Sequence, residues 1–409
     1  MMDGWKTIRI DDLGKVITGN TPPKKDPSNY GSAYPFIKPT DMDVGRRYVT
    51  SWEENYSDKA FKRYKNSYIP PGATGVVTIG TVGEKMFQAD QYCFTNQSVN
   101  VVIPNESYDP NFVYYLLKIN LPKVENANPG TASGRHHVSK SNFCAIKVKV
   151  PKSKAVQRKI ASILSAYDDL IENNLKRIKL LEEQAQQTYE EWFVRFKFPG
   201  HEDAVFDEVS GLPEGWEKSN LEDLMILNYG KALKAENRIP GNYNVYGSSG
   251  IVGKHNTYLV SGPGIILGRK GNVGSVFWSE NNFFVIDTAY YITTNSSPYY
   301  IYYLLKNENF VNNDAAIPGL SRKAAYLKEI LNPNHEILFF FEKKIQSLFK
   351  IKINLQNQNQ LLKEARDILL PRLMMGIVDV DDLLVDNGVY EISQENLGIA
   401  AEVVNGYKK

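Results

Sequence analysis

The chain of 409 residues is 42% hydrophobic, and it is therefore long enough to bury two or more cores. It contains no run of 18 apolar residues and no apolar segment near Asp3 that would form a secretory signal, so we expect a cytoplasmic protein. The net charge of +2 is unevenly distributed: the acidic segments 201–211 and 377–409 carry −4 and −5, which leaves +11 for the rest. Such a basic excess is compatible with a polyanionic partner, but it is also typical of a solvated surface.

The sequence contains an internal repeat. The opening MMDGWKTIRIDDL returns as LPEGWEKSNLEDL at 212–224, and the shared spacing extends to Gly19 and Gly230. Further matches occur in the same order: GTVG at 80–83 with GNVG at 271–274, TNQSVNVV at 95–102 with IDTAYYIT at 286–293, FVYYLLK at 112–118 with YIYYLLK at 300–306, and VSK at 138–140 with LSR at 320–322. The offset between matches shrinks from 211 to 182, as expected if the first copy has the longer loops. The chain is therefore two versions of one unit.

Each copy is expected to begin with a β-rich domain. Short β-branched segments such as GATGVVTIG and GPGIILGRKGNVGSVFW alternate with Gly, Pro, Asn and Ser, which favours short strands and turns, with GRKGNVG in a hairpin. A short helix with a buried Phe/Tyr/Leu face is predicted at 110–118 and again at 298–306. One long helix then closes each copy.

The two long helices are predicted to extend from after Pro151 to about Phe196 and from about His335 to Leu370, where Pro371 breaks or kinks the second one. Apolar residues follow one another at spacings of four and three in both helices, as in the seam of a coiled coil. Each seam contains one asparagine, Asn174 or Asn359, which costs stability and fixes register. We therefore expect the helices to pair with each other antiparallel; separate packing of each helix on its own domain is the alternative. The residues predicted to pair are Ile160, Asn174, Ile178, Leu181, Ile345, Leu348, Leu355, Asn359 and Leu362.

These elements predict an α+β fold with two tandem mixed α/β domains, an antiparallel coiled coil of two long helices and a pseudo-twofold internal repeat. The expected boundaries are 1–150 for the first domain, 151–198 for the first helix, 199–211 for an acidic linker, 212–334 for the second domain, 335–376 for the second helix and 377–409 for an acidic tail.

Catalytic motifs are missing from the sequence. It contains no GxxxxGK[ST] phosphate loop, and NTPP, ANPG and LNPN lack a glycine-rich fingerprint for S-adenosylmethionine. His136 and His137 are adjacent and have no nearby Cys or carboxylate cluster, so we expect no metal site. Cys93 and Cys144 are expected to be reduced, partly buried thiols.

Basic residues interleaved with aromatic and amide side chains occur in loops of both copies, and such side chains bind phosphates and base edges of DNA. Each one alone is more often an ordinary surface charge. The candidate DNA-binding residues are Lys24, Lys25, Lys38, Arg46, Arg47, Lys62, Arg63, Lys65, Arg135, His136 and Lys140 in the first domain and Lys231, Lys234, Arg238, Lys254, His255, Arg269, Lys270, Asn272, Arg322 and Lys323 in the second.

Taken in order, the duplicated openings, GRKGNVG, the YYLLK helices, the two seam helices and the final LLPRLMMG resemble the specificity subunit of type I restriction–modification enzymes over about residues 1–380. The resemblance implies that each β-rich domain recognises half of a bipartite double-stranded DNA site. It implies that the helices set the spacing and dock two methyltransferase (modification) subunits, and that restriction (helicase–nuclease) subunits join the complex. No catalytic residue and no cofactor is expected on this chain; S-adenosylmethionine, ATP and Mg would belong to the partners.

One departure concerns the glycine turn, where the second copy has Arg269 and Lys270 and the first has Thr78 and Ile79. A contact made by the second copy therefore cannot be assumed for the first. Two other function classes remain open at this level. A tandem carbohydrate-binding or adhesin-like protein would also be duplicated and aromatic, and a self-contained restriction enzyme would need methyltransferase and nuclease motifs.

Overall fold

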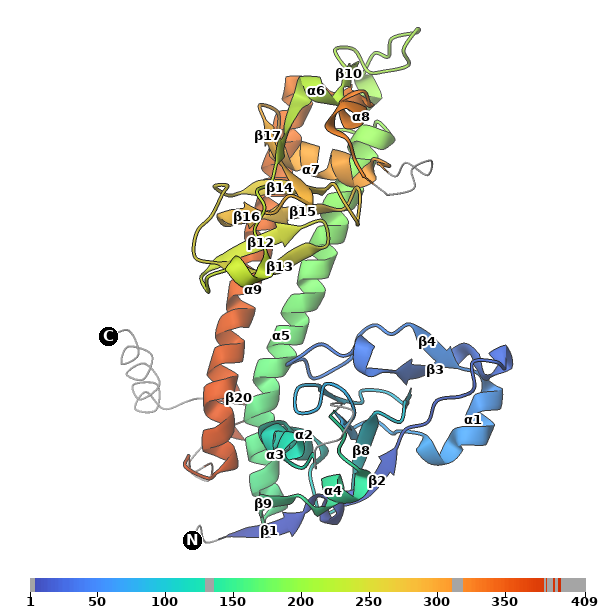
Figure 1. Cartoon of the computed structure of the whole chain (residues 1–409), viewed down its shortest axis with the longest axis vertical. Helices are drawn as coiled ribbons and strands as arrows, with labels where there is room; N and C mark the ends of the chain where they lie inside the picture. Colours follow the sequence, from blue (N-terminus) through green and yellow to red (C-terminus); the bar gives the residue numbers. More distant parts are fainter. Residues whose placement is uncertain are drawn as a thin grey trace. The chain divides into compact units, whose positions relative to one another are not determined.

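The structure is a computed structural model that describes residues 4–128, 136–310, 319–378, 380, 385–386 and 389–390. The chain forms two compact units, Met1–Asn174 with Asn357–Lys409 and Leu175–Gln356. Each unit combines one β-rich domain with parts of both long helices (Figure 1). None of the helices in these described ranges is both long and apolar enough to cross a membrane.

The first domain contains a four-stranded sheet in the order β2-β8-β5-β6, a three-stranded sheet in the order β4-β3-β7 and the antiparallel pair β1-β9. A basic helix, α1, follows β4, and the predicted Phe/Tyr/Leu helix is α2. The elements are β1 (Trp5–Arg9), β2 (Gly14–Thr18), β3 (Tyr30–Ile37), β4 (Glu54–Tyr56), α1 (Asp58–Tyr64), β5 (Thr74–Val77), β6 (Met86–Gln88), β7 (Phe94–Thr95), β8 (Val99–Pro104), α2 (Pro110–Ile119), α3 (Leu121–Asn126), α4 (Lys140–Ala145), β9 (Lys147–Pro151) and α5 (Lys154–Tyr189).

The second domain repeats this topology with the sheets β11-β17-β14-β15 and β13-β12-β16 and the pair β10-β18. Each three-stranded sheet contains one parallel pair of strands, β3 with β7 in the first domain and β12 with β16 in the second. The elements are β10 (Glu217–Asn220), α6 (Leu221–Leu224), β11 (Met225–Tyr229), β12 (Tyr243–Gly247), β13 (Gly250–His255), β14 (Gly264–Gly268), β15 (Val276–Ser279), β16 (Phe283–Val285), β17 (Ala289–Thr294), α7 (Pro298–Asn307), α8 (Arg322–Tyr326), β18 (Glu329–Asn332) and α9 (His335–Met374). A short pair, β19 (Val385–Asp386) and β20 (Val389–Tyr390), lies in the tail. The predicted α+β fold with an internal repeat is confirmed.

The alignment of one repeated segment is wrong by one residue. Val77 pairs with Val99 in the first domain and Gly268 pairs with Ala289 in the second, so β8 matches β17 at an offset of 190 rather than 191. The connection between β5 and β6 has eight residues, whereas that between β14 and β15 has seven. The extra residue follows the GTVG turn, which is why the two glycine turns still match at the predicted offset.

Gly19 and Gly230, the last matched residues of the two openings, have the same structural reason to be glycine. A Cβ added to Gly19 would lie 2.2 Å from the carbonyl oxygen of Thr95, and one added to Gly230 would lie 2.2 Å from that of Ile286. Any residue with a Cβ would clash with these carbonyl oxygens, so both positions require glycine.

The long helices differ at their ends from the prediction. Helix α5 ends at Tyr189 and continues as one π-helical turn, Glu190–Val194, before Phe196 adopts a positive φ of 56°. Helix α9 does not end before Pro371 but runs through it to Met374. Pro371 has no N–H to donate to the carbonyl oxygen of Asp367, so α9 lacks that backbone hydrogen bond although the helix continues for three more residues.

Within each unit the two helices pack antiparallel. Asp168 forms an ion pair with Arg366 in the first unit, and Glu182 forms one with Lys352 in the second. The residue number rises by fourteen along α5 while it falls by fourteen along α9, so the two helices run in opposite directions. In the first unit Nδ2 of Asn174 donates a hydrogen bond to Oδ1 of Asn359 at 2.9 Å, and both side chains are buried. The pairing of amide with amide fixes this register, because a shift by one turn would leave both amides buried without a partner.

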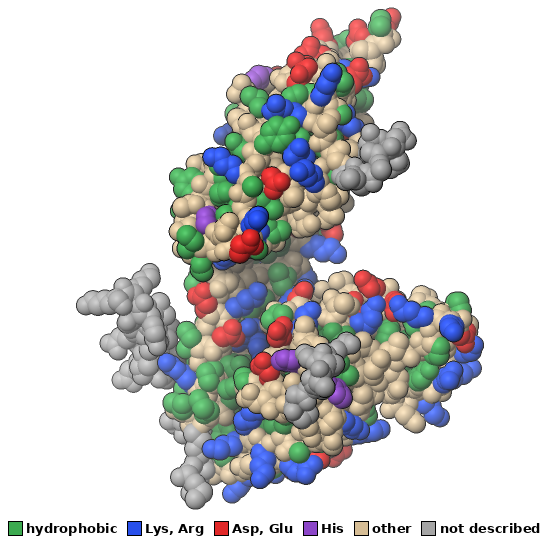
Figure 2. Space-filling model, viewed as in Figure 1, with side chains coloured by type: hydrophobic (Ala, Val, Ile, Leu, Met, Phe, Trp, Pro, Cys, Tyr) green, Lys and Arg blue, Asp and Glu red, His purple; other side chains and the backbone are tan. Residues whose placement is uncertain are grey.

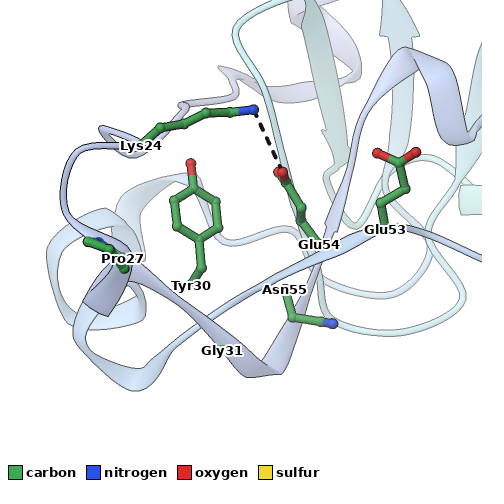
Figure 3. Close-up of a pocket in the computed structure, with 7 residues that line it drawn as sticks. All are labelled: Lys24, Pro27, Tyr30, Gly31, Glu53, Glu54 and Asn55. Carbon is green, nitrogen blue, oxygen red and sulfur yellow. Dashed lines mark ion pairs between the residues drawn. The ribbon is translucent and has the colours of Figure 1, made fainter. Parts of the chain in front are cut away.

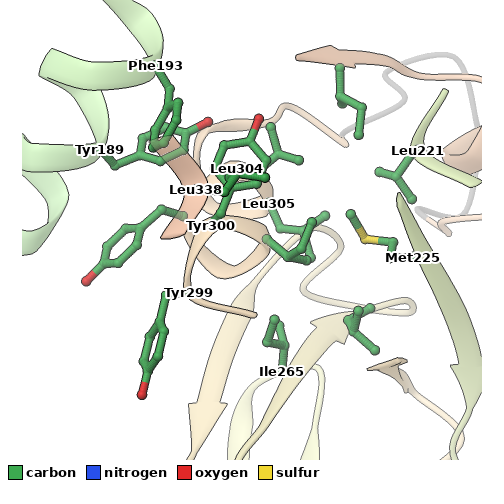
Figure 4. Close-up of a cluster of buried hydrophobic side chains, with 14 of the residues drawn as sticks. Tyr189, Phe193, Leu221, Met225, Ile265, Tyr299, Tyr300, Leu304, Leu305 and Leu338 are labelled. Atoms are coloured by element: carbon green, nitrogen blue, oxygen red, sulfur yellow. The ribbon is translucent and has the colours of Figure 1, made fainter. Parts of the chain in front are cut away.

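The predicted pairing residues divide between the two units. Ile160, Asn174, Ile178, Ile345, Leu355 and Asn359 are buried, and Leu181, Leu348 and Leu362 are half-buried. In the second unit the helices and the domain share one aromatic core (Figure 4). There the ring of Phe193 lies 4.8 Å from that of Tyr300 on α7 and 4.9 Å from that of Phe341 on α9.

In the first unit, by contrast, buried polar groups join the domain to the helices. The Arg47 guanidinium donates to Oε1 of Gln88 at 2.7 Å, to Oδ1 of Asn111 at 2.7 Å and to Oγ of Ser165 on α5 at 2.9 Å. Asp168 accepts a hydrogen bond from Arg366 on α9 and another from the hydroxyl of Tyr115 at 2.6 Å. We call these two clusters the polar latch. Because they are buried and satisfied, removing any one member leaves another polar group without a partner.

Lys118 beside the polar latch is expected to destabilise the fold at neutral pH. Its Nζ is buried without a hydrogen-bond partner, and burial lowers its pKa from 10.5 to about 8. Since the folded pKa lies below the unfolded one, the cost of burying the charge is absent above about pH 10.5 and complete below about pH 8. Lys118→Met should therefore raise the free energy of unfolding by about 1–3 kcal/mol at pH 7 and by less at pH 9.5, measured by urea denaturation.

Lys306, the counterpart of Lys118 on α7, provides the matched control, because burial lowers its pKa as well but its side chain is exposed, whereas Nζ of Lys118 is buried without a hydrogen-bond partner. Lys306→Met should change the stability much less. Equal stabilisation by both variants, or none by Lys118→Met, would contradict this account of Lys118.

Candidate nucleic-acid interface

The repeated domains present equivalent loops at one end of the four-stranded sheet. In the first domain the β5–β6 connection forms a bridge between Ile79 and His137, just before α4. In the second domain the β14–β15 connection forms the same bridge between Lys270 and Gly319, just before α8. The glycine turn and the start of the following short helix therefore lie side by side in both copies, and we call this region the recognition end.

At the recognition end of the second domain, cationic and aromatic side chains gather. The guanidinium of Arg269 lies 4.7 Å from the ring centre of Tyr229, and that of Arg322 lies 5.0 Å from the same ring. Arg269 also donates to the backbone carbonyl of Asp287 at 3.2 Å, whereas Nζ of Lys270 lies 3.7 Å from the Asp287 carboxylate. The ring of Tyr229 is 45% exposed, so this stack is open to solvent.

At the corresponding positions of the first domain, neutral polar groups replace the stack. Thr18 pairs with Asn100 as Tyr229 pairs with Tyr290, and Thr78 occupies the place of Arg269. Oγ1 of Thr18 donates to Oδ1 of Asn100 at 2.7 Å, and Nδ2 of Asn100 donates to Oγ1 of Thr78 at 3.1 Å. This chain of hydrogen bonds is internally satisfied, so the first domain offers a ligand no cation at this position.

Most of the predicted DNA-binding residues lie on the surface. On the face drawn in Figure 2, Lys and Arg side chains gather along the outer rim of the first unit, including the end that carries α1. The exposed candidates are Lys24, Lys25, Lys62, Arg63, Lys65, His136, Lys140, Lys231, Lys234, Lys254, Lys270, Asn272, Arg322 and Lys323, and the partly exposed ones are Lys38, Arg46, Arg238 and Arg269. Arg135 lies outside the described residues.

Several of these cations are already neutralised by carboxylates. Lys38 contacts Glu53 at 2.8 Å, and Lys24 lies 3.9 Å from Glu54. These acids line a cavity of about 360 Å³ together with Tyr30, Gly31 and Asn55 (Figure 3). Lys24 lines the cavity as well, and both carboxylates are paired with Lys24 or Lys38, so these cations are already engaged and are weak candidates for a phosphate contact.

The predictions for Arg47 and His255 are wrong, because both side chains are buried. Arg47 is 2% exposed and belongs to the polar latch, where it binds protein acceptors. His255 is 8% exposed and accepts a hydrogen bond at Nδ1 from the backbone N–H of Ile239. Neither group can reach DNA from its buried position.

Arg46 and Arg238 bind the protein itself, although each is partly exposed. Arg46 contacts Glu172 on α5 at 2.7 Å, and the hydrogen bonds that it donates to this carboxylate raise the pKa of Arg46. Arg238 donates to the carbonyl oxygen of Val252 at 2.6 Å and thereby fixes the loop before β12. Both arginines therefore bind other parts of the protein, Arg46 a carboxylate on α5 and Arg238 a backbone carbonyl oxygen.

Tyr229 is a residue of the recognition end that the sequence did not single out. Aromatic residues at strand positions are usually core, and its neighbour Tyr290 is indeed fully buried. The internal repeat alone pointed to Tyr229, because the match of Gly19 with Gly230 aligns it with the small polar residue Thr18. A large exposed ring in place of a threonine distinguishes the two copies.

The described part of the chain has no group of three or more His, Cys, Asp or Glu side chains that could hold a metal ion. Cys93 and Cys144 are free and buried, and burial raises the pKa of the Cys93 thiol to about 12. The geometry thus favours binding by exposed cations and rings over chemistry by activated groups.

Comparisons with known proteins agree with this arrangement. The family model for the type I restriction modification DNA specificity domain matches residues 2–183 and 213–360, once for each copy. The type I restriction enzyme MjaIX specificity subunit of Methanocaldococcus jannaschii is 29% identical over 413 residues, which cover 93% of this chain and 94% of that one. The HindI specificity subunit of Haemophilus influenzae is 28% identical over 44% of this chain and 39% of its own length.

Among solved structures, the S subunit of a type I restriction–modification system from M. genitalium has the same fold, with a TM-score of 0.56 and 18% identity over 90% of this chain and 96% of that one. The resemblance seen in the sequence motifs is thus confirmed by both kinds of comparison. The two matches of the family model together cover most of the chain. The chain belongs to the type I restriction modification DNA specificity domain family.

Proposed function

We propose that this protein is the DNA sequence-specificity subunit of a type I restriction–modification complex, and that each β-rich domain recognises one half of a bipartite site. The observation that carries the proposal is the repeat itself. Two domains of identical topology present the glycine turn and the following short helix at the same end of the sheet. Different side chains at equivalent positions then give each domain its own sequence preference.

The long helices are proposed to set the distance between the half-sites and to dock two modification subunits. Three apolar side chains support docking: Ile351, Leu361 and Ile368 on α9 are between 42% and 65% exposed. Leu361 and Ile368 are seven residues apart and therefore lie on one face of the helix. Exposed apolar residues along a charged helix are typical of a surface that a partner covers.

Catalysis is proposed to belong to the partners. S-adenosylmethionine would bind to the modification subunits, and ATP and Mg to the restriction subunits; the match of both copies to a DNA specificity family supports this division. The carbohydrate-binding alternative is not favoured, since both copies match the DNA specificity family.

Methylation-aware sequencing of the host genome with and without this gene tests the proposed function. We expect one bipartite methylated motif to disappear when the gene is deleted and to return when it is supplied again. The purified chain alone should neither methylate nor cleave DNA containing that motif. Methyl transfer by the pure chain, or an unchanged methylation pattern in the deletion strain, would overturn the proposal.

A further inference from the structure

We propose that Arg269, held by the ring of Tyr229, recognises a guanine in the half-site of the second domain, and that Arg322 contacts the neighbouring phosphate. The inference rests on the proposed function and adds the base and the residues that recognise it. It concerns the second domain alone.

The first step is that the Arg269 guanidinium is fixed before any ligand binds. The ring of Tyr229 lies 4.7 Å from it, the ring of Tyr290 lies 5.6 Å from it, and the carbonyl oxygen of Asp287 accepts one of its N–H groups. A guanidinium that packs against two neighbouring rings loses less side-chain entropy when it binds a ligand. A fixed orientation is also what recognition of one base edge requires.

The second step is that donors remain for a ligand. A guanidinium has five N–H groups, and the protein offers Arg269 the carbonyl oxygen of Asp287 and the hydroxyl of Tyr290. The remaining donors match O6 and N7 of guanine, the two adjacent acceptors that guanine presents in the major groove. Lys270 next to it is a weaker candidate, because its ammonium faces the Asp287 carboxylate and lacks the planar, preorganised fork of a guanidinium.

The third step concerns Arg322, which shares the Tyr229 ring with Arg269. Two positive charges around one ring repel each other, so the site gains from an anion beside them. Arg322 and Lys323 are exposed at the start of α8, close to the glycine turn, where a DNA phosphate would neutralise this charge.

The fourth step is the contrast with the first domain. There the equivalent groups Thr18, Asn100 and Thr78 are hydrogen-bonded to one another. Such a site has no guanidinium and no exposed ring, so a loss of Arg269 affects one half-site and leaves the other intact.

The experiment uses the full modification complex with five variants of this chain, one of which is Arg322→Met. Arg269→Lys keeps the positive charge but removes the planar, forked guanidinium. Tyr229→Leu removes the ring against which the Arg269 guanidinium packs. Tyr229→Phe keeps the ring, and Lys270→Met removes the neighbouring charge. Each variant is expressed in the host, the methylated motif is sequenced, and binding to duplexes with each base at each position is measured.

We expect Arg269→Lys and Tyr229→Leu to lose roughly tenfold or more of their discrimination at one guanine of one half-site, with the other half-site unchanged. Tyr229→Phe should retain the discrimination that Tyr229→Leu loses, because it keeps the ring. Lys270→Met and Arg322→Met should weaken binding to all sequences and flatten its salt dependence, while the preferred base at each position stays the same. An unchanged motif in Arg269→Lys, or a loss spread evenly over all positions, would overturn the inference and leave the proposed function intact. Absence of any motif that depends on the wild-type gene would instead overturn the proposed function.

Discussion

Inserting a matched heptad into both long helices is expected to move the half-sites about three base pairs further apart. The insertion points are between Arg177 and Ile178 in α5 and between Gln356 and Asn357 in α9, which oppose each other in the register of the helices. Seven residues lengthen each helix by about 10 Å, and one base pair occupies about 3.4 Å of duplex. The sequences of both half-sites should stay the same, since no recognition loop changes.

The spacing is measured from the methylated motif of the variant complex. Seven residues also turn the helix by about 20° short of two full turns, so we expect less methylation at the new spacing than at the original one. A heptad in α5 alone is the control, because it leaves the paired helices of unequal length and should abolish methylation. An active double-insertion variant that kept the original spacing would show that the helices do not set the distance.

Asp168→Ala is expected to give the largest loss of stability among single substitutions in the first unit. Asp168 and Arg366 are both 3% exposed at the side chain, and the carboxylate also accepts the Tyr115 hydroxyl. Removing it leaves a buried guanidinium and a buried hydroxyl without this partner, which costs about 3–5 kcal/mol of unfolding free energy. Urea denaturation of the purified chain measures the change.

Glu182→Ala is the matched control on the same helix. Glu182 also pairs with a cation on α9, Lys352 at 3.7 Å, but its side chain is 55% exposed. Its removal should cost less than about 1 kcal/mol, since water screens the pair and the Lys352 ammonium, whose side chain is only 13% exposed, still lies 4.2 Å from the centre of the Phe349 ring. If the two substitutions were equally mild, the polar latch would contribute nothing to stability.

The helices and the repeat could be predicted because their signals are local and periodic. The seam positions recur every three or four residues, and Asn174 and Asn359 occupy equivalent places in the two helices. The seam spacing and the two asparagines determine the packing of the helices directly, since side chains at this spacing share one face of a helix. The alignment of β8 with β17 was wrong by one residue because the connections before these strands differ in length by one residue. The length of a connection cannot be read from a periodic pattern.

The candidate site was harder to predict, because exposure depends on partners that are distant in sequence. Arg46 and Arg47 are neighbours in a loop, but one bonds to Glu172 and the other to Ser165 in α5, more than a hundred residues later. Arg269 and Arg322 look no different from them in the sequence, yet they remain beside an exposed ring. Arg269 donates to the carbonyl oxygen of Asp287 and Arg322 to that of Leu227, but each guanidinium keeps further N–H donors. Only the fold shows which arginines keep donors for a ligand.

The strand pairs at the base of the two domains have a consequence for inheritance. Arg9 pairs with Lys147 where β1 meets β9, and Asn220 pairs with Glu329 where β10 meets β18. Each domain thus leaves and rejoins the chain at one place, and two crossovers in the gene would exchange residues 10–146 as a cassette. The incoming cassette would meet the same two backbone ends, and it would fit the unchanged helices if it also carried partners for Ser165 and Asp168 in the polar latch. A lineage can therefore acquire a new half-target in a single recombination event, without passing through intermediates that recognise nothing.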